Sequence, residues 1–309
     1  MGTANSLLRN PSHNRTVWIG AAVLAVLVAA TSIFLIQRKH ERAADVRFAP
    51  FGNAYSTKTD FAVVEYRYPL SPKALMTLTP ANIRNYNQEQ VDQIYARLTA
   101  GPIPNGSYDG DLFFPKGISG KQRLEEIAGG LKGRLAGLEL EKMTILGRML
   151  WKGKVFYRDQ RVLRNRIDHL NLLEEFFPDP QHKEALRQLS ANGKTDHLYF
   201  PAKLYCGQSL MDSRRESVII DYAFTDDIEG YRQVPDMLAG REGLVVRDEI
   251  RMVRPGFYLG RAYAGNSFLL NFTLFNDEVA RAGSDQFQKT GRVSEDCWVG
   301  TQRQQQAAL

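Results

Sequence analysis

The sequence is poor in the residues that build metal centres and disulfide frameworks. Its 309 residues include only two cysteines, Cys206 and Cys297, and five histidines. Two cysteines are too few for a disulfide framework or an all-cysteine zinc site. No two histidines stand in an HxxxH or HxH spacing, so we expect no dedicated metal site. The two cysteines are compatible with one disulfide or with two separate thiols.

Motifs for cofactors and for nucleophilic catalysis are also missing. The sequence has no GxGxxG fingerprint, no P-loop and no HExxH, the motifs that bind dinucleotides, phosphates and zinc in many enzymes. Gly207-Gln-Ser-Leu-Met211 resembles a serine-nucleophile motif but has Met211 at the second glycine position. Asp226, Asp227 and Glu229 lack the twelve-residue spacing of a calcium loop. We therefore expect no cofactor.

Most of the chain has no strong excess of positive or negative charge. The net charge is +6 and 43% of the residues are apolar, values typical of a globular protein. Residues 1–16 carry +2, residues 37–48 carry another +2, and residues 49–309 carry only +2. Because so little of the excess belongs to the main part of the chain, we expect no nucleic-acid partner.

One long uncharged segment, residues 17–36, stands between these two basic regions. As a helix it would span about 30 Å, the thickness of the hydrocarbon core of a bilayer. It is longer than the apolar region of a signal peptide, and no clear A-x-A site follows it. The sequence therefore predicts a single uncleaved transmembrane helix over 17–36. Residues 1–16 would form an N-terminal tail and residues 37–60 a linker.

The orientation of this span is less clearly marked. Arg38, Lys39, Arg42 and Arg47 slightly favour a cytoplasmic position for the C-terminal side. A short N-terminal tail before a large C-terminal part is, however, the usual layout of an exported, signal-anchored domain. We expect a single-pass protein of the bacterial inner (plasma) membrane with a periplasmic soluble domain.

The remaining sequence predicts an α+β domain over 61–290, followed by a polar C-terminal tail over 291–309. A helix is expected over 88–98, because Asn87 and Gln90 form a capping box before an apolar stripe. Further helices are expected over 121–149, 170–177 and 181–189. Expected strands are 61–68, 107–114, 151–157, 197–206, 216–222, 243–253, 256–263 and 267–275. Short connections between the later strands indicate an antiparallel meander that curls into a barrel or half-barrel.

The hairpin around residues 254 and 255 places an acid and a base opposite each other. If Val253 and Gly256 form the closing pair, Asp248 faces Arg261 within an otherwise apolar row. This row would face inward, so the two charges should pair. One interpretation is a structural ion pair. The other is an anchor in a cavity, where Arg261 binds a ligand carboxylate or phosphate and Asp248 holds the guanidinium.

Two stretches resemble a known group of domains. Residues 101–106 read Gly-Pro-Ile-Pro-Asn-Gly, and residues 151–156 read Trp-Lys-Gly-Lys-Val-Phe. Together with Tyr108-Asp-Gly110 they resemble uncharacterised bacterial domains with a Trp-[Arg/Lys]-Gly-Lys-x-Phe motif, over roughly residues 95–275. That motif is similar to lipocalin-like domains of unknown function, a resemblance that implies a calycin-type barrel and no particular activity.

The resulting hypothesis is a membrane-anchored protein that binds an apolar or amphiphilic, lipid-like ligand inside the barrel. The candidate ligand-binding residues are Trp151, Asp248, Phe257, Arg261 and Tyr263. One alternative is a membrane-tethered enzyme in which a buried Asp248 or Asp221 acts as acid or base. Another is a scaffold that docks a membrane-protein partner through the helix over 121–149. In each case residues 17–36 would contact the lipid bilayer.

Overall fold

The computed structural model describes residues 44–52, 60–113, 151–168, 188–191, 194–232, 236, 239–243, 245–293 and 295–297. The chain divides into two units, Met1–Ala43 and Ala44–Leu309, and every described residue lies in the second. The predicted membrane span and the helices expected over 121–149 and 170–177 lie outside the described residues. No helix among the described residues is long and apolar enough to cross a membrane.

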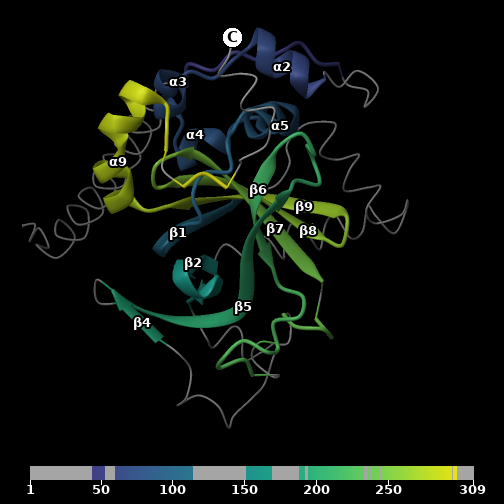
Figure 1. Ribbon diagram of the computed structural model, residues 1–309, viewed down its shortest axis with the longest axis vertical. Coiled ribbons are helices and arrows are strands. Elements are labelled where there is room, and N and C mark those ends of the chain that lie inside the picture. The colour runs from purple at the N-terminus through teal and green to yellow at the C-terminus, as the bar shows by residue number, and fades with distance from the viewer. Residues whose placement is uncertain are drawn as a thin grey trace, which may run out of the picture. The chain divides into compact units, whose positions relative to one another are not determined.

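The described strands form one antiparallel sheet that closes into a barrel (Figure 1). Around the barrel the order is β1 (Gly106–Phe113), β2 (Trp151–Tyr157), β3 (Val162–Ile167), β5 (Lys194–Gln208), β6 (Glu216–Asp221), β7 (Val246–Arg254), β8 (Phe257–Ala264) and β9 (Ser267–Phe275). The pairing of β3 with β5 and of β1 with β9 completes the ring. A short strand, β4 (Gln188–Ala191), pairs with the beginning of β5. The expected antiparallel, barrel-like sheet is therefore confirmed.

Most of the expected elements are present. Helix α5 (Gln88–Ala96) begins with the expected capping box, in which the Asn87 and Gln90 side chains each accept from the other residue's backbone N–H. The strand expected over 61–68 is wrong, because this stretch forms α2 (Phe61–Arg67). The Asp60 side chain accepts a hydrogen bond from the Ala62 N–H, and this cap favours a helix despite the alternating apolar pattern. The helix expected over 181–189 is contradicted at Gln188 and Leu189, which lie in β4.

Several elements were not expected from the sequence, among them one strand and one long helix. Strand β3 has polar side chains on both faces, with Arg164 on the outside and Asn165 inside, so it lacks an apolar row. Helix α9 (Asp277–Thr290) buries only Ala280 and Phe287, which makes its apolar stripe very narrow. Periodicity is a weak signal for α9 because few of its positions are buried, and for β3 because buried polar residues interrupt its apolar pattern.

The N-terminal helices cover the outer face of β7, β8 and β9 (Figure 1). They are α2, α3 (Pro72–Thr77), α4 (Pro80–Ile83) and α5. Their buried apolar residues pack with Val253, Phe257 and Leu259 of the barrel. Residues 44–50, which the sequence placed in the linker, lie along α5, where the Ala49 N–H donates to the Gln93 side chain at 2.8 Å.

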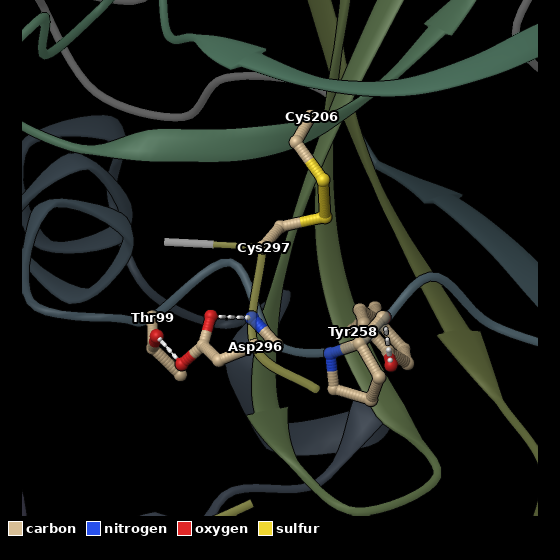
Figure 2. Close-up of a disulfide and its surroundings, with 7 residues drawn as sticks. Thr99, Cys206, Tyr258, Asp296 and Cys297 are labelled. Carbon is tan, nitrogen blue, oxygen red and sulfur yellow. Dashed lines mark hydrogen bonds between the residues drawn. A yellow bond between two sulfur atoms is a disulfide. The ribbon is translucent and has the colours of Figure 1, made fainter. Parts of the chain in front are cut away.

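One end of the barrel is closed by two distant segments joined through a disulfide. Cys206 of β5 forms a disulfide with Cys297. The two cysteines are therefore paired, and the bond ties part of the expected C-terminal tail to the barrel. The Cys297 N–H donates to the Gly101 carbonyl at 2.9 Å, and the Gly101 N–H donates to the Asp296 carboxylate at 2.9 Å. The hydroxyl of Thr99 donates to the same carboxylate (Figure 2). We call this the disulfide end.

Two glycines allow aromatic rings to fill the barrel. A Cβ at Gly110 would lie 2.3 Å from the ring of Trp151, and one at Gly260 would lie 2.3 Å from the ring of Phe272. Each ring therefore lies directly on the backbone of the neighbouring strand. A side chain at either position would therefore clash with the ring and force it to move.

Loss of the disulfide should destabilise the domain. Cys297→Ser is expected to lower the free energy of unfolding by about 2–5 kcal/mol, because the cross-link closes a long loop in the unfolded chain. Urea unfolding of the oxidised protein followed by circular dichroism measures the change. Wild-type protein in excess reductant and the Cys206→Ser/Cys297→Ser variant are the controls and should show the same loss. Equal stability of all forms would contradict a structural role for the bond.

Candidate functional site

The register of the β7–β8 hairpin differs by one residue from the sequence expectation. Asp248 lies opposite Ala262, and Arg261 lies opposite Glu249. Two differences combine: Arg254 and Phe257, rather than Val253 and Gly256, form the closing pair, and a bulge between Met252 and Arg254 inserts one extra residue into β7. Because a shift of one residue moves a side chain to the other face of a sheet, Asp248 and Arg261 point to opposite sides. The predicted ion pair between them is therefore wrong.

Asp248 faces the barrel interior and pairs with a lysine of β2. Its Oδ2 atom lies 3.0 Å from Nζ of Lys154, and the two side chains are 7% and 3% exposed. The hydroxyl of Tyr222 donates to the same oxygen at 3.3 Å. The acid expected inside the barrel is thus present, but its cation comes from a different strand.

The Lys154 ammonium is surrounded by hydrogen-bond acceptors and aromatic rings. It donates to Oδ1 of Asn165 at 2.8 Å and to the hydroxyl of Tyr222, in addition to its bond with Asp248. The rings of Trp151, Tyr222 and Phe272 lie 5.2–5.4 Å from Nζ, a distance at which a ring face attracts a cation. Three acceptors match the three protons of an ammonium group.

Two further polar groups complete this cluster. The indole N–H of Trp151 donates to Oδ1 of Asn165 at 3.0 Å, and the Asn165 amide donates to the carbonyl of Phe200 at 2.9 Å. We call Trp151, Lys154, Asn165, Tyr222 and Asp248 the barrel network. It contains one formal positive charge and one formal negative charge, so it is electrically neutral as a whole.

Burial shifts the pKa values of the network in the directions that disfavour charge. It lowers the pKa of Lys154 and raises the pKa of Asp248, and the attraction between the two groups partly offsets both changes. Burial also raises the pKa of Tyr222 well above its usual value, so the hydroxyl keeps its proton. The network therefore offers hydrogen-bond donors and acceptors in a region of low polarity.

The other predicted site residues lie outside the barrel, under the helices. Nη1 of Arg261 is 2.5 Å from Oδ1 of Asp92 in α5, and its Nε donates to the hydroxyl of Tyr263 at 2.9 Å. The guanidinium stacks 4.1 Å from the centre of the Phe268 ring. Phe257 packs in the apolar cluster between helices and barrel. Of the five candidates, the fold brings together Asp248 and Trp151 and separates them from Arg261, Tyr263 and Phe257.

Sequence reasoning did not identify Lys154, Asn165 and Tyr222 as members of the site. The available signal was the inward carboxylate of Asp248, which requires a cation inside the barrel. A bulge between Trp151 and Gly153 also changes which residues of β2 face inward. That irregularity allows Trp151 and Lys154 to share the interior, which strict alternation would forbid.

The barrel network lies between two apolar regions. Towards the disulfide end it is followed by the buried side chains of Phe156, Ile250, Met252 and Tyr258. At the opposite end, partly buried apolar residues pack against the core; these are Leu112, Trp151, Phe200, Val246 and Leu270. We call this the Trp151 end.

Comparisons with known proteins assign no family. No protein-family model matches the chain, and no curated protein matches it. Among solved structures, the chain is similar to the crystal structure of a protein from Thermomonospora curvata, with 17% sequence identity and a TM-score of 0.33. The alignment covers 62% of this chain and 88% of that chain. The barrel architecture described above rests on the strand pairing alone.

Removal of the Lys154 side chain should show how strongly the unpaired Asp248 carboxylate lowers the free energy of unfolding. Lys154→Met is expected to lower the free energy of unfolding by about 3–5 kcal/mol at pH 8, because Asp248 is left without its cation. Burial then raises the pKa of Asp248 above that of the unfolded chain, so protonation favours the folded state. The loss relative to wild type should therefore shrink as the pH falls from 8 to 5, as measured by urea unfolding.

The matched control removes both charges. Lys154→Met/Asp248→Leu should recover much of the lost stability and should show little dependence of the difference on pH over the same range. A deficit in Lys154→Met that stays constant with pH would contradict the pairing of these two groups.

Proposed function

We propose that this barrel domain binds an apolar or amphiphilic small molecule whose polar group contacts the barrel network. The observation that supports this proposal most strongly is the Lys154–Asp248 pair, which lies inside an interior otherwise made of apolar and aromatic side chains. Small-molecule sites in proteins combine mostly apolar walls with a few convergent polar groups. The barrel architecture is compatible with a small molecule held inside it.

The energetic cost of the network favours a role beyond stability. Burying two charges is expensive, and well-packed apolar residues in their place are often as stabilising or more so. Groups whose pKa values are shifted by burial and by a specific partner also cluster at functional sites.

The ligand would enter at the Trp151 end. The opposite end is closed by residues 99–103 and by the segment bonded through Cys297, whereas Trp151, Val246 and Leu270 are only partly buried. An apolar chain lying against these residues would bring its polar group close to the indole N–H of Trp151 and to Asn165.

We further propose that the domain is held at a membrane on the extracytoplasmic side. The disulfide between Cys206 and Cys297 supports an oxidising compartment, where such bonds form and persist. The uncharged segment over 17–36 would supply the anchor. In a bacterial cell this corresponds to the periplasmic face of the inner membrane, where lipid-like molecules are at hand.

Ligand binding can be tested directly on the full chain. Native mass spectrometry of protein purified in mild detergent should show an additional mass from a co-purified lipid-like molecule. The uncharged fluorophore N-phenyl-1-naphthylamine should bind with increased fluorescence. Ala262→Leu, which enlarges an inward side chain near the Trp151 end, should weaken its binding about tenfold or more, because the larger side chain competes for the same space.

The control for this experiment is a substitution far from the barrel interior. Tyr66 on α2 is 83% exposed, so Tyr66→Ala should leave binding unchanged. Urea unfolding of both variants shows whether each remains folded under the assay conditions. A wild-type protein that carries no added mass and does not bind the fluorophore would contradict the proposed function.

A further inference from the structure

We infer that the barrel network selects ligands with an uncharged, oxygen-bearing head group, such as a ketone or a hydroxyl, over a carboxylate or an ammonium on the same chain. This inference rests on the proposed function and names the chemistry of its ligand. It follows from two properties of the network, its charge balance and its hydrogen-bond balance.

The charge balance disfavours any charged head group. Lys154 and Asp248 neutralise each other at 3.0 Å, and both side chains are almost completely buried. A ligand carboxylate placed beside them would add a second negative charge next to Asp248. A ligand ammonium would add a second positive charge next to Lys154. Either would be a buried charge without compensation, which is among the most costly arrangements in a protein.

The hydrogen-bond balance favours an acceptor oxygen. Two donors hold Oδ1 of Asn165, Lys154 Nζ at 2.8 Å and the Trp151 indole N–H at 3.0 Å, which matches the two lone pairs of a carbonyl oxygen. The Tyr222 hydroxyl has one proton and lies 3.3 Å from both this oxygen and Oδ2 of Asp248, so it can donate to either one. If a ligand oxygen accepted one of the two donors, the Tyr222 proton could replace that donor at Asn165.

The donor best placed to change partner is Trp151. Its side chain is only partly buried and lies at the end of the barrel where the ligand would enter, whereas Lys154 and Tyr222 are also engaged with Asp248. A ligand ketone or hydroxyl oxygen could accept the indole N–H. The Tyr222 hydroxyl could then turn its proton from Asp248 to Oδ1 of Asn165, which would again have two donors, while Asp248 would keep Lys154 as its partner.

The test compares four ligands of equal chain length on the full-length protein in mild detergent. Octan-2-one, octan-1-ol, octanoate and octylammonium each compete with bound N-phenyl-1-naphthylamine at pH 7.5. We expect the ketone and the alcohol to displace the fluorophore at concentrations about tenfold or more below those of the two ions, since an unpaired buried charge weakens binding by at least that factor. Equal displacement by octanoate and octan-1-ol would overturn the inference and leave the proposed function standing.

Two variants test the charge balance and the hydrogen-bond balance of the network separately. Asp248→Asn leaves the positive charge of Lys154 uncompensated, so octanoate should gain about tenfold or more relative to octan-1-ol. Trp151→Phe removes the donor but keeps an aromatic ring, so it should weaken displacement by octan-2-one about three- to tenfold. An unchanged ligand order in Asp248→Asn would overturn the charge argument, and unchanged ketone binding in Trp151→Phe would overturn the role of the indole.

The outcomes separate this inference from the proposed function. Fluorophore binding that none of the four ligands displaces would overturn the inference alone. A fluorophore that does not bind the wild-type protein would overturn both. If Asp248→Asn does not fold, the order of the four ligands on the wild-type protein still decides the question.

Discussion

The pairing of β3 with β5 closes the sheet, and the rest of the described structure depends on that closure. It divides every strand into an inner and an outer face and removes the free edges that an open sheet would expose. Lys154, Asn165 and Asp248 belong to three different strands and meet only because the ring is complete. The interior network is therefore a product of the topology as well as of the residues.

On both faces of the barrel, a buried cation is paired with a carboxylate. Inside, Lys154 is matched by Asp248. Outside, beneath α5, Arg261 is matched by Asp92 and lies over the ring of Phe268. In both places a cation is desolvated, paired with one carboxylate and flanked by aromatic rings, which is the arrangement that makes a buried charge tolerable. The helices are thus attached to the barrel by a partly ionic interface, and the site inside is isolated from it by the sheet.

The two ends of the barrel differ in structure, so the domain is asymmetric along the barrel axis. At the disulfide end, Cys297 and Asp296 hold the segment that contains Thr99 and Gly101 (Figure 2). At the other end, apolar residues including Trp151 remain partly exposed. One end is therefore held by a covalent bond, and the other is lined by side chains that are only partly buried.

The sequence by itself determined the positions of β1, β2 and β5–β9, the antiparallel meander and the capping box of α5, because these depend on alternation and on contacts between near neighbours. It also indicated correctly that Asp248 would lie inside. Only the tertiary structure decided its partner. The bulge after Met252 shifts the hairpin register by one residue, and the bulge in β2 turns Lys154 inward with Trp151. Such irregularities follow from packing between strands far apart in the chain, which local patterns do not record.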